Sequence, residues 1–183
     1  MTLSEARALM HEWVANPALR VHMECVAACM RACAERTDAG QTERWQVCGL
    51  LHDMDWEKHP TREEHPFVAV SVLRERGVDE EILTAILGHA EYSGTPRETP
   101  MARALFGVDE LAGFIVACAK VRPDGIATLE PKSVRKKFKA KEFAAAVSRE
   151  DIARGIAELG VDEDAHIRMC IDALRAERDR LGI

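Results

Sequence analysis

Residues 99–121, TPMARALFGVDELAGFIVACAKV, form a long and strongly apolar stretch. Its apolar residues recur at spacings of three and four, which is the period of an α-helix. Thr99 and Pro100 supply an N-cap followed by proline at the first helical position, so we expect a helix that ends near Val121. Asp109 lies among the apolar positions of this helix, and a carboxylate there needs a partner or a metal ion to offset its lost hydration.

The same helical spacing runs through the rest of the chain, and strict alternation over strand lengths is hard to find. We therefore predict an all-α fold. Earlier helices are expected at residues 4–14, from Asn16-Pro17 to about 36, from a Thr42 cap through LLHDM, from a His65-Pro66 cap to Gly77, and from Asp79 to about 90. After a turn-rich connector and a basic segment, further helices are expected from Ser148 and over about 162–181.

Length and charge bound the class of protein. The 183 residues, 47% of them hydrophobic, amount to one compact domain over residues 1–183. The formal net charge is -6, and an acidic chain is a poor partner for a nucleic-acid polymer or an anionic membrane. We expect a small-molecule ligand instead. The oligomeric state is left open.

The six cysteines lie in apolar helical segments, and none belongs to a CxxC pair. Free, buried thiols are expected. The N-terminal residues do not have the pattern of a signal peptide, and no apolar run is long enough to span a membrane. Both features predict a cytoplasmic protein.

Several histidines and aspartates occupy positions that should face the core. His22 shares a helix face with cysteines and a valine, and His89 follows isoleucines on one stripe. His52 and Asp53 end the run VCGLLHD, where adjacent side chains about 100° apart can converge on one ion. Each histidine alone could be an ordinary hydrogen-bonded core residue. Together, imidazoles and carboxylates without thiolate favour iron, manganese, cobalt, nickel or magnesium over structural zinc, and hence a metal-activated water.

The order His22, then His52-Asp53, then Asp109 resembles the H…HD…D signature of the HD superfamily. The resemblance covers about residues 16–121 and includes LLHD, ILGH and GVDELAGFIVA. It implies an HD-domain helical bundle that acts as a metal-dependent phosphohydrolase, with a C-terminal helical extension over about 122–183. The chain also resembles a group of small predicted HD hydrolases that share an HD-x-D-aromatic turn and a VRP…KSVRKKFK…FAA segment. That likeness implies a reaction class and no particular substrate.

Some HD families have two further histidines between HD and the last aspartate, and these hold a second metal ion. By order, the resemblance implies His65 and His89 in these positions, with Asp53 bridging two ions. The cofactor would then be one or two divalent ions. The wording HDMDW departs from the HDIG pattern, because Asp55 stands where glycine would be. The resemblance therefore does not imply cyclic-dinucleotide specificity.

Several other residues are also candidates for the functional site. Asp53 and His52 are candidate catalytic residues, and Lys58, like Asp55 and Glu57, could act on the leaving group. The basic run that contains Lys132, Arg135 and Lys136 could be a lid that binds substrate phosphate, or a solvated helix face. His59 is a rival of His65, whereas His11 and His166 are expected to be ordinary histidines.

The leading function is hydrolysis of a phosphate ester or anhydride of a nucleotide or another phosphorylated small molecule. A di-iron oxygenase is the first alternative, because a minority of HD proteins use the same ligand order to activate oxygen. A non-catalytic nucleotide-binding HD protein is the second, although such a protein would have no need to keep all six ligand positions.

Overall fold

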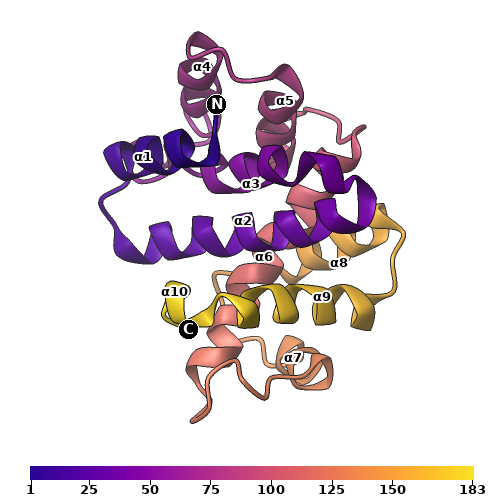
Figure 1. The fold of residues 1–183 in the computed structure, drawn as a ribbon. Coiled ribbons are helices and arrows are strands. Elements are labelled where there is room, and N and C mark those ends of the chain that lie inside the picture. The colour runs from indigo at the N-terminus through magenta and orange to yellow at the C-terminus, as the bar shows by residue number, and fades with distance from the viewer.

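The computed structural model describes residues 1–183 and contains ten α-helices, two short 3-10 helices and no strand (Figure 1). The all-α prediction is confirmed. The helices are α1 (Leu3–Trp13), α2 (Pro17–Thr37), α3 (Thr42–Leu51), α4 (Phe67–Glu75), α5 (Glu80–His89), α6 (Pro100–Lys120), α7 (Pro131–Phe138), α8 (Arg149–Leu159), α9 (Glu163–Ala176) and α10 (Arg178–Leu181). The 3-10 turns are η1 (Ala39–Gln41) and η2 (Glu91–Ser93).

The two longest helices, α2 and α6, form the centre of the molecule. Helix α2 packs against α3, α6 and α9, while α6 packs against α5 and α8. In Figure 1, α1 and α3 lie on one side of α2 and α9 lies on the other. The buried apolar side chains form one cluster that includes Val26 of α2, Leu105 of α6 and Cys170 of α9. The C-terminal helices therefore share the core of the N-terminal ones.

Local sequence signals account for most helix starts. The side chain of Asn16 accepts hydrogen bonds from the first turn of α2, and Thr99, Asp79 and Asp162 cap α6, α5 and α9 in the same way. These bonds satisfy backbone N–H groups that have no partner inside the helix. The caps predicted at Asn16, Asp79, Thr99 and Ser148 are present.

Some of the predicted helix boundaries are wrong. Thr42 is the first residue of α3 and not its cap, because the 3-10 turn η1 leads directly into the helix and Gln41 takes the N-cap position without a side-chain bond. The final helix is also not continuous. It ends at Ala176, where Glu177 leaves helical geometry, and α10 follows as a separate turn.

Helices α6 and α8 approach closely at a pair of glycines. A Cβ atom on Gly155 would lie 2.7 Å from the Cα of Gly107, which is a contact no side chain could make. This approach lays α8 along the part of α6 that contains Gly107 and leads up to Glu110. All six cysteines are free and buried, as predicted. No helix combines the length and the apolar character that a membrane span requires.

A buried carboxylate joins the two ends of the chain to α2. Glu24 is 8% exposed and accepts hydrogen bonds from Arg7 of α1 at 2.5 and 3.1 Å and from Arg180 of α10 at 2.7 Å. Burial would raise the pKa of Glu24, but the two guanidinium groups overcome this effect and hold the pKa below its ordinary value. The carboxylate is therefore charged in the folded protein at neutral pH.

Replacing Glu24 with glutamine is expected to lower the free energy of unfolding by about 1–2 kcal/mol, because the two arginines lose their anionic partner while remaining partly solvated. Urea denaturation at pH 7 measures this change. Because the folded-state pKa is lowered, the difference from the wild type should shrink as the pH falls below about 4. Glu35→Gln, at an exposed position on the same helix, is the control and should cost less than about 0.5 kcal/mol. An equal loss for both variants would contradict the prediction.

Candidate metal centre

The six candidate ligands come from five segments of the chain and meet in one place. His22 lies on α2, Asp109 on α6, and His89 is the last residue of α5. His52 and Asp53 follow the end of α3 directly, and His65 precedes α4. Side chains at the ends of α3 and α5 thus face His22 on α2 and Asp109 on α6. Every residue predicted as a metal ligand lies in this cluster.

One half of the cluster surrounds a single oxygen of Asp53. The Oδ2 atom of Asp53 lies 3.6 Å from His22 Nε2 and 3.4 Å from His52 Nε2. The same two nitrogens lie 3.0 and 3.2 Å from Asp109 Oδ1. Two imidazoles and two carboxylates therefore face one point.

The other half of the cluster surrounds the second oxygen of Asp53. The Oδ1 atom lies 3.6 Å from His65 Nε2 and 3.4 Å from His89 Nε2. The two histidine nitrogens lie 3.2 Å apart. Asp53 consequently stands between two pairs of imidazoles, with one carboxylate oxygen directed to each pair.

Hydrogen bonds on the far side of the rings select the tautomer of three histidines. The Nδ1 atom of His52 lies 2.8 Å from the carbonyl of Gly49, and that of His89 lies 2.5 Å from the carbonyl of Ile86. The Nδ1 atom of His65 lies 2.7 Å from Asp55 Oδ1. Because carbonyl and carboxylate oxygens only accept, each Nδ1 donates, and each Nε2 can direct its lone pair into the cluster. Metal-binding histidines are oriented in this way.

Asp55 has two tasks that explain why His65 does not cap α4. The helix begins at Phe67, its N-cap position is Pro66, and no side chain of either residue caps it. Instead, the backbone N–H of Ala69 donates to Asp55 Oδ2 at 2.7 Å. The predicted His65 cap is therefore wrong. The fully buried Asp55 caps the helix from the preceding turn, which leaves the His65 ring free to face the cluster.

The residues present fit a divalent ion. Ligand atoms bound about 2.0–2.2 Å from one ion lie roughly 2.8–3.6 Å from each other at tetrahedral or octahedral angles, and the nitrogen–oxygen distances given above fall in that interval. The Nε2 atom of His52 is also fully buried and has no hydrogen-bond partner. A buried polar atom without a partner is costly, and a cation at this point would satisfy it.

The charges of the cluster favour a cation as well. Burial opposes ionisation of Asp53 and Asp109, but the neighbouring histidines hold the pKa of both carboxyls well below the usual range. Burial also opposes a charge on His52, yet Asp53 and Asp109 raise its pKa well above the ordinary value. A metal ion that binds at the Nε2 atom of His52 would therefore compete with a proton for this nitrogen. Beside Asp109, burial and the Asp109 charge raise the pKa of Glu110 to about 7.

Removing the charge on Asp55 tests its role as a positioning residue. Asp55→Asn keeps the volume and the acceptor for Ala69, but it weakens the bond that orients His65. We expect the affinity for a divalent ion bound through His65 to fall about 10- to 100-fold, measured by competition with a chromophoric chelator. The thermal unfolding temperature of the apo protein serves as a control for a merely structural effect. An unchanged metal affinity would show that Asp55 only caps α4.

The cluster lies at the floor of an open cleft of about 800 Å³. Arg62 and Arg154 are the only lysine or arginine residues that line this cleft. Trp56 and Tyr92 line the cleft and are 43% and 40% exposed, which leaves aromatic surface beside the cluster. Arg62 stacks over the Tyr92 ring, with 5.3 Å from the guanidinium carbon to the ring centroid.

Some predicted site residues lie outside this cleft. Lys58 is exposed and stacks over the ring of Trp13, and it does not line the cavity. Glu57, which was also a candidate to act on the leaving group, accepts hydrogen bonds from the backbone of Ala15 and Asn16. His59 pairs with Glu64 at 3.0 Å. The structure does not bring any of them to the cluster.

The basic run is likewise not a lid. Lys132, Arg135 and Lys136 lie on α7, which packs against α9 and the end of α6 and occupies the opposite end of the molecule from α4 and α5 in Figure 1. None of the three lines the cleft, and Arg135 pairs with Asp164 of α9 at 3.1 Å. The connector at residues 121–130 turns the chain away from the cleft before the basic run begins, so the lid prediction is wrong.

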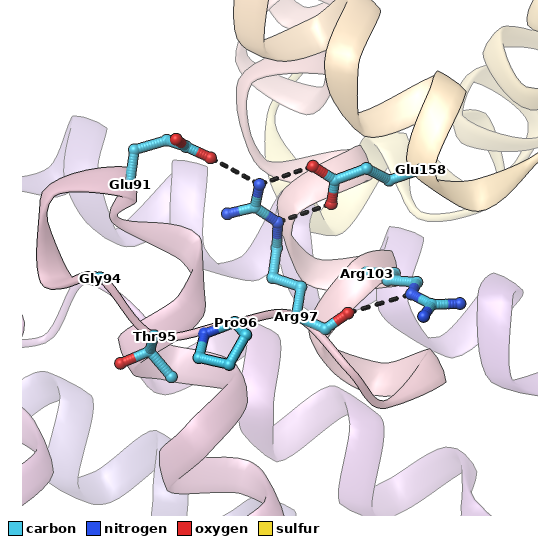
Figure 2. A pocket seen from close by; sticks show the side chains of 7 residues that line it. All are labelled: Glu91, Gly94, Thr95, Pro96, Arg97, Arg103 and Glu158. Carbon is cyan, nitrogen blue, oxygen red and sulfur yellow. Dashed lines mark hydrogen bonds and ion pairs between the residues drawn. The ribbon is translucent and has the colours of Figure 1, made fainter.

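The segment between α5 and α6 is held beside the cleft by Arg97. Its guanidinium donates to both oxygens of Glu158 on α8, at 2.6 and 2.7 Å, and to Glu91 at 2.5 Å (Figure 2). It also donates to the carbonyl of Gly88 at 2.9 Å, next to His89. The other oxygen of Glu91 lies 2.6 Å from Arg154. Arg97 therefore ties the end of α5, the loop and α8 into one wall of the cleft.

Sequence reasoning did not identify Arg62, Arg154 and Glu110 as cleft residues. Glu110 adjoins Asp109, which was a usable signal. Nothing in the sequence marks Arg62 or Arg154 as a cleft residue. Arg62 lies in a turn-rich connector, and Arg154 lies on an amphipathic helix, 45 positions after Asp109. Only the packing of α8 on α6 brings Arg154 to the cleft.

Comparisons with known proteins agree with the cluster. A family model described as HD domain matches residues 20–113, a span that contains all six candidate ligands. Comparisons with curated proteins and with solved structures find no match.

Proposed function

The chain belongs to the HD domain family, and we propose that it is a divalent-metal-dependent phosphohydrolase with two adjacent metal positions. The observation that carries the proposal is the division of the cluster around Asp53, with one carboxylate oxygen facing His22 and His52 and the other facing His65 and His89. Divalent ions bound there would activate a water molecule and neutralise charge on a phosphoryl group.

The protein's own groups would position the ions and the substrate. His22, His52, Asp53 and Asp109 would hold one ion, and His65 and His89, together with Asp53, would hold the other. Arg62 and Arg154 are the cleft's only permanent cations and would bind phosphate oxygens. The exposed faces of Trp56 and Tyr92 would pack against the organic part of the substrate. Such a cleft suits a phosphorylated small molecule, including a nucleotide.

Arg154→Gln is expected to raise KM about tenfold and to leave kcat within about threefold, because the lost contact to phosphate is made in both the ground state and the transition state. Steady-state kinetics on the best substrate of the screen described below measures the split. Arg76→Gln, at an exposed position directly after the end of α4, is the matched control. A fall in kcat at unchanged KM would instead assign Arg154 to the chemical step.

The proposal is tested with a metabolite-wide phosphatase screen in which manganese, cobalt, nickel, iron and magnesium are supplied separately. Phosphate release is measured for nucleotides, sugar phosphates and p-nitrophenyl phosphate, with the ion content of the same samples determined by mass spectrometry. Turnover under argon that depends on metal and is lost in Asp53→Ala is the expected result. Absence of phosphate release in all samples that contain two ions per chain would overturn it.

The same preparations, assayed in parallel in air, separate hydrolysis from oxygen activation. A di-iron oxygenase would require iron and would consume oxygen without releasing phosphate, so oxygen uptake is recorded in the samples held in air. Activity with manganese or magnesium under argon is incompatible with the oxygenase.

A further inference from the structure

A separate cavity of about 500 Å³ lies beside the first turns of α6. It is formed by α2, α3, α6, the end of α8 and the start of α9, and it has no residue in common with the cleft. A volume of this size is typical of small-molecule sites, which occupy roughly 300–1,000 Å³. Nothing in the proposed metal chemistry uses it.

The floor of this cavity is apolar and uncharged. Trp45, Ala104 and Met169 are buried and line it. Burial raises the pKa of the Cys33 thiol and lowers the pKa of His166, so both are neutral at pH 7. The Nε2 atom of His166 is already committed to the carbonyl of Gly107 at 3.0 Å. The floor therefore favours an apolar group and offers no site for a charge.

The rim carries free positive charge. Arg36 lines the cavity and has no hydrogen bond or ion pair, although its charge reaches Cys33 and His166. Arg103 uses only its Nε, which donates to the carbonyl of Arg97 at 3.0 Å. Figure 2 shows its two terminal nitrogens without a partner among the residues drawn. Both guanidinium groups keep donors available for an anion.

The acidic side chains of the rim are already engaged. Glu158 binds Arg97 through both of its oxygens, and Asp162 accepts the N–H of Ala165 at 2.9 Å as the cap of α9. Asp162 keeps its negative charge, and the two arginines exceed it by one positive charge at the mouth. This arrangement favours an anion with an apolar tail.

We propose that this cavity binds an organic monocarboxylate with an apolar body. The carboxylate accepts hydrogen bonds from Arg36 and Arg103 at the rim, because the planar guanidinium fork matches carboxylate geometry. The aliphatic or aromatic body fills the floor against Trp45 and Met169. The site is separate from the metal cluster, so its occupancy does not depend on the proposed hydrolase activity.

The test is isothermal titration calorimetry of the metal-loaded protein with octanoate, octan-1-ol and acetate. Octanoate carries both features, octanol lacks the charge, and acetate lacks the apolar body. We expect octanoate to bind with one site per chain and at least about tenfold more tightly than either comparison compound. Octanol loses the charge-assisted hydrogen bonds of the carboxylate, and acetate loses the burial of the apolar body. Equal affinity for octanol would overturn the proposal, because the rim arginines would then have no role.

Substitutions in the cavity test whether octanoate binds there. Arg36→Gln and Arg103→Gln change exposed side chains, so folding should be retained, and each is expected to weaken octanoate binding at least about tenfold. Ala165→Trp, at an exposed position that lines the mouth, should abolish binding by filling the cavity. Arg76→Gln and Ala145→Trp, at exposed positions that line neither cavity, are the controls. Octanoate affinity unchanged in Arg36→Gln, Arg103→Gln and Ala165→Trp would place the ligand elsewhere and overturn the proposal.

Discussion

Asp53→Ala is expected to abolish turnover and to remove bound metal while the chain stays folded. Asp53 is the one side chain that faces both halves of the cluster, with its two oxygens 3.4–3.6 Å from the Nε2 atoms of four histidines. Its loss removes a ligand from each position and leaves four imidazoles with a single carboxylate to balance the ions. Activity should fall below about one-thousandth of wild type, because the metal-activated water supplies several kcal/mol of the rate enhancement.

Metal content per chain, phosphate release and thermal unfolding of the same preparation measure the outcome. Asp151→Ala is the matched control, since Asp151 lines the same cleft but does not belong to the cluster, and it should retain both ions. Normal activity in Asp53→Ala would show that the site assignment is wrong. A variant that does not fold would be replaced by Asp53→Asn, which keeps the side-chain volume and still removes the charge.

His89→Ala is expected to reduce the metal content from two ions per chain to one. The Nε2 atoms of His89 and His65 lie 3.4 and 3.6 Å from Asp53 Oδ1, whereas His22, His52 and Asp109 are unchanged in the variant. The first ion should therefore stay bound. Turnover should fall strongly, because a second ion can no longer share the charge on the phosphoryl group.

The measurement is ion content by mass spectrometry after gel filtration, with His59→Ala as the control. His59 lies six positions before His65 but pairs with Glu64 outside the cluster, so its loss should leave two ions in place. A different result would change the mechanism. If His89→Ala raised KM at an unchanged metal count, the histidine would contact substrate phosphate above a single ion, and the mononuclear mechanism would hold.

The fold class, most helix boundaries and the six residues of the cluster could be predicted from the sequence, His65 only through the resemblance to HD proteins. Helical period and caps are local features, and Asn16, Asp79 and Thr99 each satisfy N–H groups within their own first turn. Residues that would be costly to bury alone, such as Asp109, also reveal themselves locally, because their neighbours in the helix are apolar. The resemblance to HD proteins then supplied an order for the ligands.

The arrangement of the six residues around Asp53, and the side chains that surround them, follow from tertiary packing alone. The role of Asp55 depends on α4 lying beside the turn after α3, where one carboxylate can bond both His65 and the backbone of Ala69. For the basic run the sequence left a phosphate-binding lid and a solvated helix face both open, because it shows the charge of the run and not its location. Arg154 reaches the cleft instead, because Gly107 and Gly155 let α8 pack closely on α6. Packing between distant segments sets these positions, and no local pattern in the sequence records it.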